Sequence, residues 1–216
     1  MSPSRQRGDR ARVVPADDGR EVRVVDSETV YDGYFRVDRY LLQHSLHGGG
    51  LGQVVSREVF ERGHVVGLLP VDLRNDQVVL IEQFRPGALA AGWEAWLWEC
   101  VAGVIEPGEQ PDEVARRECS EETGLTVGRL ELVARYLNSP GACSETMHLF
   151  VGEVDAGAAG GVFGLADEGE DILVKAMSVT DALNELEAGR IVNSKTVIAL
   201  QWLALHHDDL RSRWLA

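Results

Sequence analysis

The chain has 216 residues, of which 21 are Lys or Arg and 35 are Asp or Glu, so its formal net charge is -14 at pH 7. Hydrophobic residues make up 44% and charged residues 26%, a globular composition that excludes a disordered, collagen-like or coiled-coil chain. No apolar run approaches the roughly 18 to 20 residues of a membrane helix, and the N-terminus lacks the apolar stretch of a signal peptide, so we expect a cytoplasmic protein without a membrane partner.

The acidic balance also argues against a nucleic-acid partner, because sequence-independent binding to a phosphate backbone requires a basic surface. Positive charge dominates only at the start of the chain, and we expect residues 1–20 to be a disordered basic tail. The three cysteines are odd in number and lack CxxC spacing, which is typical of buried free thiols in a reducing compartment.

Residues 21–62 predict an N-terminal β-subdomain, because they contain three runs of alternating apolar and polar residues. The predicted strands cover 21–30, 35–46 and 53–62. The segment HGGGLG between the last two runs is rich in turn-forming glycine and separates them.

Two strands rich in Val, Ile and Leu follow, and the turn at residues 74–76 predicts that they form a hairpin. They cover 64–73 and 77–84. After a loop of Gly, Pro and Ala, residues 93–106 alternate in part and predict one further strand. A helix is expected over 111–123, because proline suits a first helical position and Gly124 suits the end of a helix.

The rest of the chain predicts more strands and two closing helices. The strands cover 129–137, 146–154 and 171–179, and the helices cover 180–188, with Thr180 as N-cap, and 194–207. Residues 211–216 remain as a C-terminal tail. This order of mixed strands and a few helices indicates an α+β fold with a mixed sheet.

The predicted helix over 111–123 places three glutamates on its apolar side. At about 100° per residue, Glu118, Glu121 and Glu122 fall on one arc. A charged run is ordinarily a solvated face, but the opposite side of this helix already supplies one. Carboxylates that face inward together repel one another and lose solvation, so they need a cation. Mg²⁺ or Mn²⁺ is the natural choice for oxygen ligands.

The loop before this helix favours cations over phosphate. A Walker-type phosphate loop ends in Gly-Lys-Ser or Gly-Lys-Thr, whereas Gly108 is followed here by Glu109. The loop therefore offers carbonyl and carboxylate oxygens in place of a lysine. Any phosphate ligand would be bound through metal.

Residues 103–125, GVIEPGEQPDEVARRECSEETGL, resemble the Nudix box at every fixed position and spacing. The matching residues are Gly103, Glu109, Arg117, Glu118, Glu121, Glu122 and Gly124. The resemblance implies a Nudix fold over 63–210, an α/β/α sandwich with a mixed sheet between helices. It also implies hydrolysis of a nucleoside diphosphate linked to another group.

From about Val24 to Leu210, collinear segments such as SREVFERGHVVGLLPVDL and IVNSKTVIALQWLALHH are similar to bacterial ADP-ribose pyrophosphatases. Pro140 occupies the position of that subfamily's substrate-marking proline, although proline is also ordinary in a turn. The resemblance implies cleavage of ADP-ribose to AMP and ribose 5-phosphate by a homodimer that exchanges residues 21–62. A related nucleotide-sugar hydrolase, for example one acting on GDP-mannose, and a non-catalytic ADP-ribose-sensing module remain alternatives.

The resemblance assigns the metal ligands. It implies that Glu118, Glu122 and the backbone carbonyl of Ala102 hold two or three Mg²⁺, with Mn²⁺ possible, and that Glu121 completes the shell. Arg117 and Glu109 are expected to form an ion pair that orients these glutamates. Gly103 and Gly124 are expected to be structural.

The general base is expected outside the box, in the acidic loop ADEGEDI at residues 166–172. The resemblance places it at Glu168, on a loop that closes over the substrate. Gly169 replaces the bulkier polar residue expected there, and this leaves Glu170 as the alternative base.

The resemblance also assigns the residues that bind the substrate. Arg85 matches an arginine that contacts phosphate, and Tyr34 and Arg57 match a pair that sandwiches adenine between a ring and a guanidinium. Pro140 and Gly141 match the turn that contacts the substrate. Ordinary strand packing explains Tyr34 and Arg57 equally well.

Overall fold

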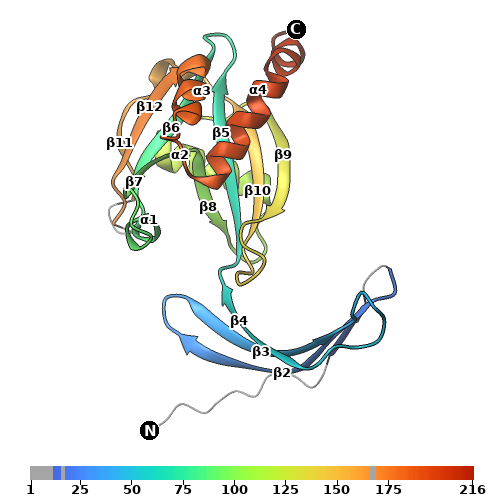
Figure 1. Ribbon diagram of the computed structural model, residues 1–216. Coiled ribbons are helices and arrows are strands. Elements are labelled where there is room, and N and C mark those ends of the chain that lie inside the picture. The colour runs from blue at the N-terminus through green and yellow to red at the C-terminus, as the bar shows by residue number, and fades with distance from the viewer. Residues whose placement is uncertain (1–11, 16–17, 166–168) are drawn as a thin grey trace. The chain divides into compact units, whose positions relative to one another are not determined.

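The computed structural model describes residues 12–15, 18–165 and 169–216 (Figure 1). The chain divides into two compact units. Unit 1 comprises Met1–Gly63 and Leu137–Glu145, and unit 2 comprises His64–Tyr136 and Thr146–Ala216. The segment Leu137–Glu145 joins unit 1 through long-range contacts such as the bridge between Phe60 and Cys143, and no local pattern in the sequence predicts such a contact.

The described residues of unit 1 form an antiparallel sheet in the order β1-β2-β3-β4. The strands are β1 (Arg12–Pro15), β2 (Glu21–Asp32), β3 (Arg36–His44) and β4 (Val55–Glu61). The predicted tail over 1–20 is therefore wrong for Arg12–Pro15, because this segment pairs along the edge of β2. Residues 1–11, 16 and 17 of the predicted tail lie outside the described residues.

The described residues of unit 2 form one mixed sheet with the central order β11-β12-β6-β5-β10-β9. Its strands are β5 (His64–Asp72), β6 (Gln77–Phe84), β7 (Trp96–Glu99), β8 (Val101–Ile105), β9 (Leu130–Leu137), β10 (Thr146–Glu153), β11 (Gly161–Phe163) and β12 (Ile172–Ser178). Strands β5 and β10 run parallel, whereas β5 and β6 are antiparallel. The mixed sheet confirms the predicted fold class.

The prediction of one strand over 93–106 is wrong, because this segment forms two strands, β7 and β8, with different partners. Strands β5 and β6 pair only next to their turn, at Val71 with Val78 and at Asp72 with Gln77. Beyond that point β7 pairs with β6 and β8 pairs with β5. The chain changes partner at Cys100, whose backbone N–H donates to the hydroxyl of Thr196 at 2.9 Å.

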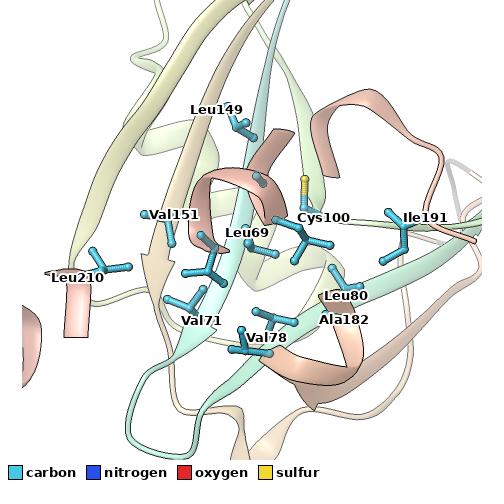
Figure 2. Close-up of a cluster of buried hydrophobic side chains, with 14 of the residues drawn as sticks. Leu69, Val71, Val78, Leu80, Cys100, Leu149, Val151, Ala182, Ile191 and Leu210 are labelled. Carbon is cyan, nitrogen blue, oxygen red and sulfur yellow. The ribbon is translucent and has the colours of Figure 1, made fainter. Parts of the chain in front are cut away.

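Helices cover both faces of this sheet. The helices are α1 (Pro86–Ala90), α2 (Pro111–Thr123), α3 (Val179–Glu187) and α4 (Ser194–Leu215), with a 3-10 turn η1 (Ala156–Ala158). Buried residues of α2 pack into one hydrophobic cluster, and those of α3 and α4 pack into the other (Figure 2). Side chains of β5 alternate between the two clusters, as Val65 and Val66 do. This arrangement is the expected α/β/α sandwich.

Helix boundaries agree with the sequence where the end signals are strong. Helix α2 has the predicted bounds, and Gly124 ends it with a left-handed φ of 69°. Helix α3 begins one residue earlier than expected, because the hydroxyl of Ser178 and not of Thr180 caps it. Helix α4 continues to Leu215 and Trp214 is buried, so the predicted tail over 211–216 is wrong.

Two further expectations concern the whole chain. No helix in the described part of the chain is long and apolar enough to cross a membrane. All three cysteines are free; Cys100 and Cys119 are buried, whereas Cys143 is only half-buried, contrary to the expectation for that residue.

Candidate active site

Two box glutamates lie along the backbone of β8. Helix α2 packs against this strand, and Gly103 leaves the space for Glu118: an added Cβ at Gly103 would lie 2.0 Å from the Cδ of Glu118. Glu122 accepts a hydrogen bond from the backbone N–H of Ala102 at 3.2 Å. The two carboxylates therefore contact adjacent residues of one strand, and the sequence needs a glycine at 103 because any larger residue would displace Glu118.

Burial makes these carboxylates hard to ionise without a cation. Burial, aided by the charges of Glu118 and Glu170, raises the pKa of Glu122 to about 8, although the N–H of Ala102 and the charge of Lys195 oppose this shift. Burial also raises the pKa of Glu118 to about 7; Arg117 opposes this shift, while Glu121 and Glu170 add to it. The site therefore favours positive charge, either as protons or as a bound cation.

Arg117 connects the loop before α2 with the glutamates of the helix. Its guanidinium lies 2.9 Å from Glu118, 3.0 Å from Glu121 and 3.6 Å from Glu109. Glu109 in turn accepts from the backbone N–H of Glu106 at 2.9 Å. These contacts can orient the box glutamates, as the sequence predicts for Arg117 and Glu109. Glu121 is more exposed than Glu118, and its described ion pair is with Arg117.

The donor chemistry fits a hard divalent cation. Glu118 and Glu122 are buried or half-buried carboxylates with raised pKa values, and they offer only oxygen ligands. Among the described residues, no group of three or more His, Cys, Asp or Glu side chains is arranged to hold a metal ion. The two glutamates would therefore need further oxygen ligands, and the carbonyl of Ala102 is the predicted one.

A buried ion cluster next to these glutamates was not predicted from the sequence. Glu99 ends β7 and is fully buried, and its Oε2 lies 2.6 Å from Nζ of Lys195 and 2.8 Å from Nη2 of Arg85. The amide of Asn193 donates to Oε1 at 2.9 Å. Burial alone would raise the pKa of Glu99, but Lys195 and Arg85 hold it below its ordinary value. The available sequence signal was a charged residue inside each of two apolar segments, WLWECVAGV and SKTVIAL.

Arg85, the predicted phosphate contact, belongs to this cluster. It stands between β6 and α1, and its side chain is partly exposed. Although burial opposes the shift, Glu99 raises its pKa, and Glu122 and Glu170 contribute to the same effect. Arg85 therefore brings positive charge to the group of box glutamates.

Of the two candidate bases, the structure describes Glu170 and not Glu168. Glu168 lies outside the described residues. Glu170 accepts a hydrogen bond from the backbone N–H of Leu165 at 3.0 Å, and its charge raises the pKa of both Glu118 and Glu122. Glu170 of the acidic loop is therefore close enough to the box glutamates to interact with them electrostatically.

The predicted adenine and turn residues belong to unit 1 and are exposed. Tyr34 is 94% exposed in the loop between β2 and β3, and Arg57 lies on β4 opposite Tyr40. Arg57 donates to the carbonyl of Ser56 at 2.7 Å, and the described interactions include no contact between it and Tyr34.

Pro140 and Gly141 lie in an exposed turn that the N–H of Ala142 closes on the carbonyl of Ser139 at 3.1 Å. The turn itself was predicted. Its contact with a substrate, like the roles of Tyr34 and Arg57, stays a prediction.

The chain is similar to known proteins over most of its length. The family model described as NUDIX domain matches residues 62–200. The chain is 49% identical over 194 residues to an ADP-ribose pyrophosphatase of Escherichia coli, covering 90% of this chain and 93% of that protein. It is 38% identical to an ADP-ribose pyrophosphatase of Haemophilus influenzae (90% and 91%) and 31% identical to a GDP-mannose pyrophosphatase of Escherichia coli (87% and 97%).

A solved structure titled as an ADP compounds hydrolase has a similar fold. Its TM-score is 0.65 with 20% sequence identity, and the match covers 96% of this chain and 98% of that chain. At this identity the similarity is evidence for the fold alone.

Proposed function

The chain belongs to the Nudix family, and from this premise we propose that it is a pyrophosphohydrolase that cleaves the diphosphate bond of ADP-ribose to give AMP and ribose 5-phosphate. Similarity over about nine tenths of the chain to proteins named ADP-ribose pyrophosphatase supports this substrate. The observation that carries the proposal is the pair Glu118 and Glu122, which lies against Ala102 and Gly103 with raised pKa values.

Nudix hydrolases need divalent metal ions, and we propose that this one uses two or three Mg²⁺. Glu118, Glu122 and the carbonyl of Ala102 would hold them, with Glu121 completing the shell. When bound, the metal polarises the diphosphate and lowers the pKa of the attacking water. The oxygen-only donor set of the box supports a hard cation of this kind.

The other residues would orient the reacting groups and move the proton. Arg117 and Glu109 keep the box glutamates in place through the contacts of the guanidinium. Arg85 offers positive charge to the substrate diphosphate. Glu168, or Glu170 in its place, takes the proton from the attacking water.

The metal assignment is tested by Glu122→Gln, which keeps the shape of the side chain and removes its charge. We expect this variant to fold and to lose metal-dependent turnover. Glu113→Gln is the matched control, because Glu113 is an exposed glutamate of the same helix. A rate near that of the wild type in saturating Mg²⁺ would contradict the role of Glu122.

The base is tested by comparing Glu168→Gln with Glu170→Gln. If Glu168 is the base, its variant loses kcat with little change in KM, and the Glu170 variant is affected less. A larger loss of kcat in Glu170→Gln would transfer the role to Glu170.

Two alternatives are less well supported. The chain is also 31% identical to a GDP-mannose pyrophosphatase, and the Nudix box does not select the group beyond the diphosphate. A non-catalytic sensor of ADP-ribose would have no need of the complete set Glu118, Glu121 and Glu122.

We further propose that the protein is a cytoplasmic homodimer whose two subunits exchange residues 21–62.

A further inference from the structure

Lys195 is a rare residue type in this chain and is buried at the start of a helix. It is one of only two lysines among the 21 basic residues of the chain, and it is 5% exposed. It stands in the first turn of α4, where the helix dipole disfavours a positive charge. A buried cation at an unfavourable position indicates a functional role, because packing alone would favour an apolar residue there.

Within the cluster of Glu99, Lys195 and Arg85, two positive charges meet one negative charge. Lys195 and Arg85 both contact the same oxygen of Glu99, at 2.6 and 2.8 Å. One cation is enough to balance one buried carboxylate, so the three side chains together carry one surplus positive charge. Lys195 is buried and Arg85 is partly exposed, and both cations also interact with the charge of Glu122, so the surplus faces Arg85 and the box glutamates.

The surroundings hold Lys195 in this position. An added Cβ at Gly67 would lie 3.5 Å from Cδ of Lys195, so the aliphatic stem lies over the backbone of β5. The neighbouring Thr196 accepts from the backbone N–H of Cys100 at 2.9 Å. The first turn of α4 is therefore fixed to the end of β7, where Glu99 lies.

We propose that Lys195 and Glu99 are positioning residues that keep the charge of Arg85 available to the diphosphate of the substrate. Glu99 holds the guanidinium in orientation, and Lys195 neutralises Glu99 from the interior. Without Lys195, Glu99 and Arg85 form a neutral pair, and the cluster no longer offers a net positive charge beside Glu122 and Glu170. This inference rests on the proposed function, in which Arg85 contacts the diphosphate.

The experiment compares three variants of the full-length protein. Lys195→Met removes the charge and retains an unbranched apolar side chain over Gly67. The double variant Glu99→Gln/Lys195→Met restores the surplus charge, because Arg85 then has no carboxylate to balance it, and the glutamine oxygen still accepts its hydrogen bond. Lys175→Met is the matched control at the other lysine, which is exposed and lies 5.5 Å over the ring of Trp98.

We expect Lys195→Met to raise KM for ADP-ribose about tenfold with kcat changed less than about threefold, as for a loss of binding shared by substrate and transition state. The double variant should return KM to within about threefold of the wild type, and Lys175→Met should leave it unchanged. An unchanged KM in Lys195→Met, an equal defect in the double variant, or the same defect in Lys175→Met would each overturn the proposal.

A binding measurement separates this inference from the proposed function. Calorimetry with a methylene-bridged, non-hydrolysable analogue of ADP-ribose needs no turnover, and its Kd should follow the same order across the variants. If the wild type does not cleave ADP-ribose, the proposed function fails, while the Kd values still decide the role of Lys195. If Lys195→Met does not fold, a Kd of the double variant about tenfold above the wild type overturns the inference, and a Kd within about threefold supports it.

Discussion

At Glu122 the proposed metal binding opposes stability, because the buried carboxylate must ionise. Its folded pKa of about 8 lies well above the ordinary value of 4.5, so the metal-free folded protein keeps a proton that the unfolded chain releases. The unfolded state therefore binds fewer protons between pH 4.5 and 8, and the contribution of Glu122 to stability is lost as the pH rises through this window.

Glu122→Gln should therefore stabilise the metal-free protein at pH 8, by about 1 to 3 kcal/mol, and change its stability little below pH 5. Chemical denaturation in the presence of a chelator measures this difference. Saturating Mg²⁺ should stabilise the wild type and not the variant, because metal binding favours the ionised carboxylate. A variant that is less stable than the wild type at pH 8 without metal would contradict the burial of an uncompensated charge.

Gly103 acts by being small. Gly103→Ala would bring Cβ to 2.0 Å from the Cδ of Glu118, so the carboxylate must move. We expect turnover to fall about a hundredfold, because small displacements of a reacting group have effects of this size. Gly87→Ala in α1 is the control, since an added Cβ there contacts nothing within 4 Å. Equal activity of the two variants would show that the position of Glu118 is not critical.

At the scale of elements, local sequence signals predicted both ends of α2 correctly. They did not predict boundaries that depend on contacts between distant residues. Proline at the start, glycine at the end and one apolar side define α2 within the sequence itself. The break at Cys100 depends on Thr196, and the environment of Glu99 depends on Asn193 and Lys195, which are also distant in the chain. The box glutamates could therefore be found from spacing alone, whereas the cluster of Arg85, Glu99 and Lys195 could not.

The end of α4 is a second case in which packing extends an element. Trp214 is buried, and its backbone carbonyl accepts from Arg129. Trp214→Ala should lower the free energy of unfolding by about 3 kcal/mol, because it leaves a large cavity. Leu205→Ala on the same helix is the control, since Leu205 is 82% exposed. Thermal or urea unfolding measures both; equal stability of the two variants would mean that the end of α4 does not pack.

At the scale of the whole molecule, the net charge of -14 conflicts with an anionic substrate until the bound metal is included. Some of the acidic excess lies in the box, where the proposed cations would be held, and some lies in the loop that contains Glu170. The sequence predicted this placement of charge from the Nudix box. It did not predict that segment 137–145 belongs to unit 1, because that association depends on contacts between distant residues.

The proposed exchange of residues 21–62 has a direct test. If Tyr34 and Arg57 act on the partner's box, mixing inactive Tyr34→Ala/Arg57→Ala protein with inactive Glu122→Gln protein should restore activity after dissociation and reassociation. Random pairing gives one complete site in each mixed dimer, or roughly a quarter of wild-type activity. Mixed dimers that stay inactive would mean that each chain binds adenine with its own residues.

A substrate panel with Mg²⁺ tests the cleavage of ADP-ribose most directly. The panel contains ADP-ribose, GDP-mannose, NADH, diadenosine polyphosphates and 8-oxo-dGTP, and chromatography identifies the phosphate-containing products. We predict the highest kcat/KM for ADP-ribose, with AMP and ribose 5-phosphate as products and no turnover after chelation. A clear preference for any other member of the panel would contradict the proposed substrate.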